Sequence, residues 1–177
     1  MWDFQNESIF GKKIVIACIL CIGLIVLCSK SFLKEEKVLI VEDLDKKMKT
    51  EYVLPDKTFT LGYIHSVLLT PAEEYFKVED DNNLMLYKTI YESFGVGLPF
   101  SQEKWEFDIK NGKFILNIKR SCDLIHLRVS PIPKHWLSIG EDRYELINLV
   151  KEPEDLVKIY AVDQWGFKVG KQFYKVF

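Results

Sequence analysis

Two stretches of this 177-residue chain carry side chains that could do chemistry. The first, residues 63–76, contains His65, Ser66 and Glu74. A carboxylate beside an imidazole fixes the tautomer of the ring and favours its protonated form, so such a pair can bind a ligand, transfer a proton or help to hold a metal ion. The position of these residues on their strands decides which of these roles is geometrically open.

The alternation of apolar and polar residues from Thr58 to Val67 predicts a β-strand, and Pro71 is expected to end it. If residues 68–71 form a four-residue loop, His65 lies directly opposite Glu74 in a hairpin. Directly opposed side chains share one face of the sheet, with Cβ atoms about 5 Å apart. This register predicts a His65–Glu74 pair on the apolar face, and a one-residue slip would remove it.

Four interpretations of the pair remain open. It is a buried polar pair that locks the hairpin, a ligand-binding site that also uses Ser66, a hydrolytic site, or a metal site. Ser66 follows His65 on a strand and points to the opposite face, so a serine–histidine dyad is geometrically poor. We therefore predict no catalytic residue and no enzymatic activity. His126 and His135 are too far apart for a close ligand pair, so each is expected on a strand face, and we predict no metal and no cofactor.

The second stretch, residues 93–99, contains Gly95 and Gly97 and ends at Pro99. Two glycines two residues apart permit a positive φ or the close approach of another group, and proline stops further strand pairing. A phosphate-binding loop would need a third glycine, a P-loop lysine or a following helix, and the stretch has none of these. We expect a turn that closes one end of a sheet, with a ligand-binding loop as the alternative.

The elements that position these stretches are short alternating runs separated by turn residues. Such spacing is typical of a mainly β protein, an antiparallel β-sandwich or a barrel-like domain. Asn111-Gly112 is the strongest hairpin signal in the chain. The expected strands are residues 38–41, 58–67, 74–78, 84–94, 105–109, 113–118, 124–129 and 144–149.

The C-terminal tail departs from this pattern. Pro153-Glu154-Asp155 is typical of a first helical turn, because proline needs no donor there and acids favour the positive end of the helix dipole. We therefore predict a short helix from there to Tyr160. Residues 165–167 and 173–177 predict a final hairpin that turns near Gly170.

Residues 14–28 have no charged side chain and no polar side chain other than cysteine. As a helix they span about 22 Å, less than the roughly 30 Å of a bilayer core, and residues 29–33 can extend the span if Lys30 snorkels. We predict an N-terminal transmembrane or signal-anchor helix within residues 1–33, followed by one β-rich domain, residues 34–177. Cleavage after Ser31, lipidation and a buried soluble helix are the alternatives.

Cysteine use adds little to this prediction. Cys18, Cys21 and Cys28 lie inside the apolar run, and Cys122 is alone in the following domain, so no disulfide can form within that domain. Without further ligands, a Cys-x-x-Cys pair inside a membrane span behaves as two small apolar residues.

Charge sets the expected side of the membrane only weakly. Lys12 and Lys13 precede the apolar run, and Lys30, Lys34 and Lys37 follow it, so the two orientations nearly tie. One span ahead of a whole domain favours export, and we expect a single-pass protein of the cell membrane with its domain on the extracytoplasmic side. Residues 34–177 hold 21 basic and 24 acidic residues, which gives nucleic acid no basic surface.

The two stretches together resemble a known family. His65-Ser66-Val67, Thr70-Pro71 and Glu74, followed by Ser93-Phe94-Gly95-x-Gly97-Leu98-Pro99, are similar to the bacterial DUF1850 family over roughly residues 37–150. The resemblance implies a small protein with an N-terminal hydrophobic segment, often encoded beside TAXI-type TRAP transporter components. The family pattern carries over onto five residues: His65, Ser66, Glu74, Gly95 and Gly97. It extends to nothing in the additional tail, residues 151–177.

The expected function is that of a membrane-tethered extracytoplasmic accessory or binding domain associated with a TAXI-type TRAP transporter. The alternative is a stand-alone small-ligand-binding envelope protein that uses the region of His65 and Glu74. A surface hydrolase and a purely structural envelope protein are the less favoured interpretations. The expected partners are the membrane, through residues 1–33, and the TRAP and TAXI components, with no nucleic acid.

Overall fold

A computed structural model of the chain describes residues 34–65, 69–92, 106–169 and 172–175, together with Val15, Ile19, Cys21 and Ile22. The chain divides into two compact units. The larger unit comprises residues 36–164, and the smaller comprises residues 1–35 and 165–177.

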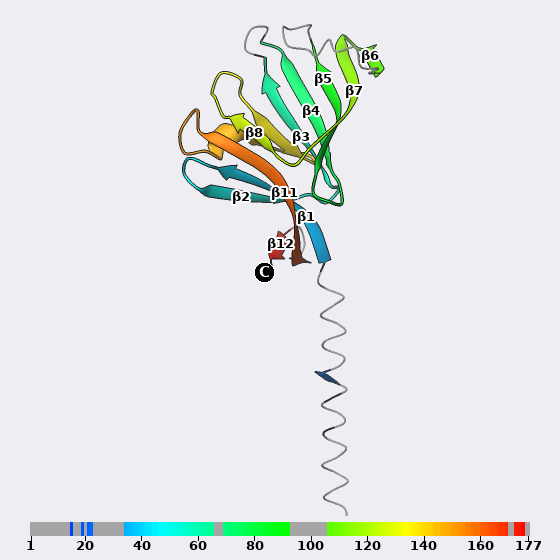
Figure 1. Ribbon diagram of the computed structural model, residues 1–177, viewed down its shortest axis with the longest axis vertical. Coiled ribbons are helices and arrows are strands. Elements are labelled where there is room, and N and C mark those ends of the chain that lie inside the picture. The colour runs from blue at the N-terminus through cyan, green and yellow to red at the C-terminus, as the bar shows by residue number, and fades with distance from the viewer. Residues whose placement is uncertain are drawn as a thin grey trace, which may run out of the picture. The chain divides into compact units, whose positions relative to one another are not determined.

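The protein is mainly β, as predicted (Figure 1). A short 3-10 helix, η1 (Leu146–Asn148), follows the tenth strand. The strands are β1 (Lys34–Asp43), β2 (Met48–Val53), β3 (Thr58–Ile64), β4 (Pro71–Val78), β5 (Leu84–Tyr91), β6 (Glu106–Lys110), β7 (Lys113–Cys122), β8 (Ile125–Arg128), β9 (Trp136–Ile139), β10 (Asp142–Glu145), β11 (Leu156–Val169) and β12 (Gln172–Lys175).

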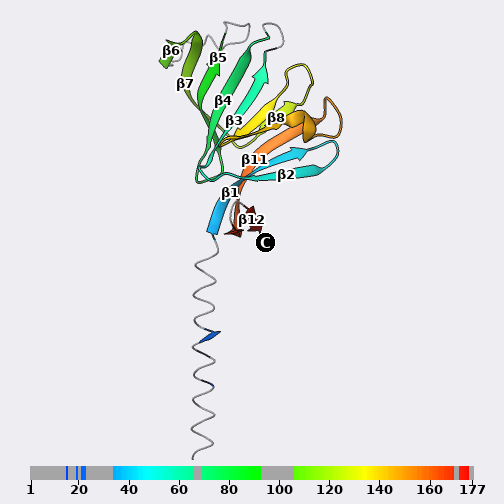
Figure 2. The same ribbon diagram turned by 180° about the vertical axis from the view of Figure 1, so that it is seen from behind.

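The strands form two antiparallel sheets, which confirms the predicted class of pairing. A seven-stranded sheet has the order β10-β9-β3-β4-β5-β7-β6. The other has the order β12-β11-β1-β2, with β8 paired to β11. Figures 1 and 2 show the seven-stranded sheet curling like a half-barrel over β1, β2 and β11.

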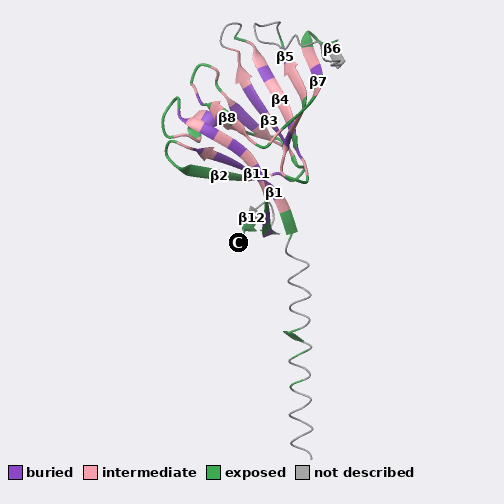
Figure 3. Cartoon of the chain, in the orientation of Figure 1, coloured by how far each residue is buried: buried purple, intermediate pink, exposed green. Residues whose placement is uncertain are grey.

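One hydrophobic core lies between the sheets of the larger unit. Alternate residues of β1, β3, β4 and β11 point into it, as the period of two along a strand requires, and Figure 3 shows the buried positions on strands of both sheets. A smaller apolar cluster, Ala72, Tyr91 and Leu116, lies on the seven-stranded sheet, with Tyr63 and Phe114 packed against it. The main core comprises Leu39, Val41, Leu54, Phe59, Leu61, Phe76, Val78, Leu84, Val129, Leu137, Leu146, Val157, Ile159 and Ala161.

The Asn111-Gly112 hairpin is confirmed. Lys110 pairs with Lys113 across it, and Asn111 and Gly112 have φ angles of 52° and 74°. A two-residue turn with positive φ at both positions matches the twist of the flanking strands, and asparagine and glycine are the residues that adopt it most readily.

The predicted helix after Pro153 is wrong. Glu154 has a φ of 70°, which no right-handed helix allows, and β11 starts at Leu156. Val157, Ile159 and Ala161 are buried in the core at every second position. The local preference of proline and acidic residues for a helix start is weak compared with the burial of this apolar face, which requires a strand.

Other boundaries also differ from the prediction. The expected strand at residues 144–149 ends at Glu145 and continues into η1, and β2 and β9 were not predicted. β9 carries Trp136, whose ring packs over Gly62 of β3. A Cβ atom added to Gly62 would lie 2.0 Å from that ring, so the sheet needs a glycine there.

The smaller unit contains the predicted C-terminal hairpin. Gly166–Val169 of β11 pair with Gln172–Lys175 of β12, so this prediction is confirmed. Val15, Ile19, Cys21 and Ile22 are helical and exposed. The other residues of the predicted anchor lie outside the described residues. In the part of the chain that the structure describes, no helix has the length and hydropathy that a membrane span requires.

Candidate functional site

The β3–β4 hairpin carries the predicted pair in a different register. Leu61, not His65, lies opposite Glu74, and the His65 backbone N–H donates to the Thr70 carbonyl at 2.9 Å. The predicted His65–Glu74 pairing is therefore wrong. The reason is Pro71, which is the first residue of β4 and pairs with Ile64 instead of ending the turn. Proline is tolerated at the start of a strand, so β4 begins at Pro71, three residues before the predicted strand at residues 74–78.

The structure thus separates the predicted site residues. His65 is half-buried at the end of β3, away from Glu74 along the strand. Glu74 lies in the middle of β4, and is also half-buried. Ser66, Gly95 and Gly97 lie outside the described residues, so their predicted contribution stays a prediction.

Glu74 lies on the face of the seven-stranded sheet that bears the core residues Phe59 and Leu61, here called the inner face. Directly opposed residues share a face, so the strand registers define rows of inner-face side chains. The row that contains Glu74 is otherwise leucine and threonine: Leu137, Leu61, Glu74, Thr89 and Leu116. The rows on either side are mostly apolar: Tyr63, Ala72, Tyr91 and Phe114, and Phe59, Phe76 and Leu86.

Glu74 therefore lies at the boundary between the main core and the smaller apolar cluster. Burial raises the pKa of its carboxyl group, and the Arg120 guanidinium opposes this by a smaller amount. Arg120 is an exposed residue of β7, and it lies opposite Leu86 of β5. Among the described residues, the Glu74 carboxylate has no hydrogen bond and no ion pair. A half-buried carboxyl group in this state can accept a hydrogen bond from a ligand when ionised and donate one when protonated.

Tyr63 lies near Glu74, and His135 lies beside Tyr63. Burial raises the pKa of Tyr63, and the Glu74 charge adds to the effect. The ring centroid of Tyr63 lies 6.1 Å from that of His135, whose Nδ1 is buried and has no hydrogen-bond partner among the described residues. Burial lowers the pKa of His135. Aromatic rings around a few polar groups are typical of small-ligand sites.

The sequence did not point to His135 as part of this site. It precedes β9 and is not on a strand face, contrary to the prediction, whereas His126 lies on β8 as expected. Its place beside Tyr63 follows from the pairing of β9 with β3, and the four-residue β9 is not among the predicted strands.

Three carboxylates gather at a second place. Asp43, Asp45 and Asp155 offer oxygens within 4.8 Å of one another, and Asp43 and Asp155 are buried. Such oxygens could hold a hard cation, but they already bind the backbone. Asp43 accepts from the N–H groups of Asp45 and Lys46 at 3.0 Å, and Asp45 accepts from that of Leu156 at 2.7 Å. The cluster thus fastens the β1–β2 turn to the start of β11.

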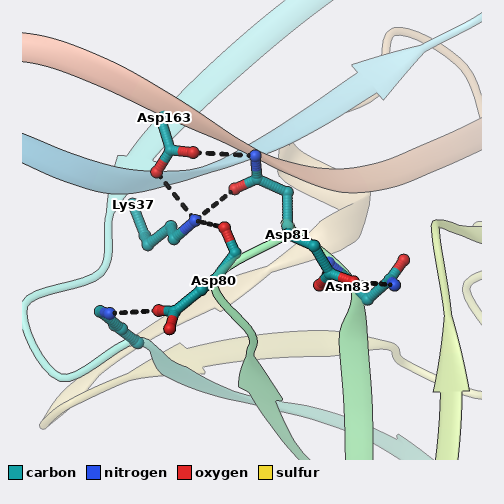
Figure 4. Close-up of polar contacts among 7 residues, drawn as sticks. Lys37, Asp80, Asp81, Asn83 and Asp163 are labelled. Atoms are coloured by element: carbon teal, nitrogen blue, oxygen red, sulfur yellow. Dashed lines mark hydrogen bonds and ion pairs between the residues drawn. The ribbon is translucent and has the colours of Figure 1, made fainter.

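A third polar group surrounds Lys37 on β1 (Figure 4). Its ammonium donates to the Asp80 carbonyl and to Asn82 Oδ1, each at 2.8 Å, and pairs with Asp163 on β11 at 2.8 Å. Asn82 Nδ2 completes the ring by donating to Asp163 at 3.0 Å. The Lys37 hydrogen bond holds the pKa of Asp163 below its ordinary value. The ammonium has three donors and all are used, so the group joins β1 and β11 to the β4–β5 turn.

A comparison with known families bears on the Glu74 region. The sequence model of one family, described as "Domain of unknown function (DUF1850)", matches residues 59–146. The matched segment comprises almost the whole seven-stranded sheet and β8, whereas β1, β2, β11 and β12 lie outside it. The match begins at residue 59, whereas the resemblance suggested a start near residue 37. No curated protein and no solved structure gives a significant match to the chain.

Proposed function

This chain belongs to the DUF1850 family, and on that basis we propose that it is a membrane-tethered extracytoplasmic binding domain that serves a TAXI-type TRAP transporter as an accessory. The resemblance described above supports the transporter context. The binding role rests on one observation: the family segment is the sheet that carries Glu74, a half-buried carboxyl group without a hydrogen-bond partner among the described residues.

The apolar run supports the membrane tether. Val15, Ile19 and Ile22 are helical, and their exposed fractions are 56%, 62% and 60%. Each large apolar side chain moved from water into lipid contributes about 1.5–3 kcal/mol. A bilayer would therefore stabilise this segment strongly.

The tether is tested by fractionating cells that express the full chain. The double variant Ile19→Asp/Ile22→Asp should leave the membrane fraction, because an aspartate at the centre of a span costs about 3 kcal/mol on insertion. The matched control is Ile109→Asp/Ile132→Asp, which makes the same change at two exposed isoleucines of the larger unit. Retention of the first variant to the same degree as the control would contradict the tether.

The transporter partner is tested by cross-linking in intact cells, followed by detergent purification of the tagged full chain. The expected result is enrichment of the TAXI receptor or the TRAP permease over a tagged, unrelated single-span protein. Repeated absence of both components under cross-linking would contradict the accessory role while leaving the tether and the binding site in place.

The second candidate is a stand-alone small-ligand-binding envelope protein, favoured by the same Glu74 carboxyl group. Here a ligand from a screen of small metabolites should raise the melting temperature of the wild type, and Glu74→Gln should abolish that shift. The control is Glu73→Gln, on the opposite face of β4, whose carboxylate accepts from the Tyr75 hydroxyl at 2.8 Å. If no ligand raises the melting temperature and His65→Ala destabilises the protein, His65 and Glu74 of the β3–β4 hairpin are structural residues.

A further inference from the structure

The C-terminal hairpin exposes a group of aromatic side chains. Trp165, Phe167 and Tyr174 have exposed fractions of 52%, 38% and 43%. Phe167 lies opposite Tyr174, and their rings stack with centroids 5.3 Å apart. Trp165 is two residues before Phe167 on β11 and so lies on the same face of the hairpin. Large exposed aromatics gathered on one face mark a surface that is covered by something else.

Charge indicates what covers this face. Residues 165–177 contain three lysines, Lys168, Lys171 and Lys175, and no acidic residue. Residues 34–164 contain 18 basic and 24 acidic residues, so the hairpin segment is positive and the preceding domain is negative. The register puts Lys168 and Lys175 at positions that alternate with Phe167 and Tyr174, on the other face of the hairpin. An anionic surface attracts lysines within about one Debye length, roughly 10 Å, so positions on either face of a two-stranded hairpin contribute to the attraction. Tryptophan and tyrosine prefer the headgroup region of a bilayer because each ring combines an apolar body with a polar group.

The hairpin also belongs to the right part of the molecule. The smaller compact unit consists of residues 1–35 and 165–177, which places the hairpin in the same unit as the apolar run. The hairpin lies outside the family segment, which ends at residue 146. The hairpin is therefore no part of the segment that the family model matches.

We propose that this hairpin is a lipid-contact element, whose aromatic face lies in the headgroup region of an anionic bilayer beside the tether. The proposal rests on the proposed function, because it needs the apolar run to be in that bilayer. The hairpin would then give the chain a second point of attachment to the membrane. A protein partner on the same face is the rival occupant.

The test uses the full chain reconstituted in vesicles of phosphatidylcholine and phosphatidylglycerol, with and without brominated acyl chains. Bromine quenches tryptophan that lies in or near the lipid, so the difference between the wild type and Trp165→Phe reports on Trp165. The expected result is that bromination removes at least about half of the Trp165 emission. Equal absolute quenching of the two proteins would overturn the proposal and leave the hairpin face for a protein partner.

The same samples separate this proposal from the tether. After an alkaline carbonate wash, protein lost from the vesicles contradicts both the tether and the hairpin contact. Protein that is retained but shows unquenched Trp165 contradicts the hairpin contact alone.

Charge variants provide a second measurement. Replacing Lys168, Lys171 and Lys175 by glutamine should reduce the quenching of Trp165 by at least about half in anionic vesicles, because each lysine contributes to the attraction. The matched control replaces three exposed lysines of the larger unit, Lys110, Lys119 and Lys134, and should leave the quenching unchanged. Equal quenching in the two triple variants, with unchanged melting of the larger unit, would overturn the electrostatic part of the proposal.

Discussion

Lys37 and Glu74 are two ionisable side chains that point away from bulk water, and their surroundings are opposite. Lys37 is 7% exposed, and each of its three donors has an acceptor. Glu74 is less buried, yet no described group bonds to its carboxylate, and burial raises its pKa. A buried charge with every hydrogen bond satisfied is part of the structure, whereas a desolvated group without a partner destabilises the fold unless something outside the chain binds it.

The comparison predicts opposite effects on the stability of the protein when the two charges are removed. Removing the Lys37 ammonium should destabilise the protein, because the acceptors around it lose their donor. Removing the Glu74 charge should stabilise the protein, because no intramolecular bond is lost. An unfavourable charge on a sheet surface is compatible with a binding site, whereas a purely structural residue gains nothing from it.

The largest effect is expected for Lys37→Met. This change leaves Asp163, Asn82 and the Asp80 carbonyl without their shared donor and should lower the free energy of unfolding by about 3 kcal/mol in urea titrations. The control is Lys57→Met, because Lys57 pairs with Asp80 at the surface and should contribute almost nothing. Equal losses in the two variants would contradict the structural role of the Lys37 group.

A smaller loss is expected for Asp43→Ala. Asp43 is 1% exposed, and its carboxylate accepts from two backbone N–H groups of the β1–β2 turn. Leaving those donors unsatisfied should cost about 2 kcal/mol in the same titration. Asp43→Asn keeps one acceptor oxygen and should lose less. If alanine and asparagine lose the same amount, the hydrogen bonds are not the source of the stability.

Parts of the fold follow from local sequence, and other parts depend on distant contacts. The alternating runs, the Asn111-Gly112 turn and the C-terminal hairpin were predictable because each signal lies within a few residues. The strand nature of residues 156–162 was not, because it depends on burial against a distant sheet. Lys37 and Asp163 are far apart in the chain, and no local pattern shows that they meet.

The candidate site was predictable in part. Glu74 was placed on the apolar face, and the structure places it on the inner face, because the true register differs from the predicted one by an even number of residues. The prediction that His65 is its partner is wrong, because Pro71 starts β4 instead of ending the turn. Arg120 lies near Glu74 through the pairing of β7 with β5, and His135 lies beside Tyr63 through the pairing of β9 with β3; sequence spacing reveals neither contact.

The opposite sign is expected for Glu74→Gln. Since the folded state raises the pKa of this carboxyl group above its ordinary value of 4.5, the folded protein binds the proton more tightly, and its stability falls as pH rises through that range. The variant lacks this loss, so its melting temperature at pH 7 should exceed that of the wild type by about 2 °C. The advantage should disappear below pH 4.5, where both proteins are neutral at this position. A variant less stable than the wild type at pH 7 would show that the carboxylate has a structural partner.

The smallest effect is expected for Arg120→Gln. This variant tests whether the Arg120 charge acts on the Glu74 carboxyl group across the inner face. Arg120 lowers the pKa of Glu74 against the larger effect of burial, so its removal should raise that pKa further. Side-chain carbon NMR across a pH titration measures the shift directly. Lys119→Gln, next to it on β7 and exposed, is the control and should leave the Glu74 titration unchanged. Because Arg120 is exposed, its removal should hardly change the melting temperature. A shifted Glu74 titration with unchanged stability would show that Arg120 acts on Glu74 through its charge alone, without a direct bond. An unshifted titration would mean that solvent screens Arg120 fully, and any ligand with an anionic group would then need another cation for its recognition.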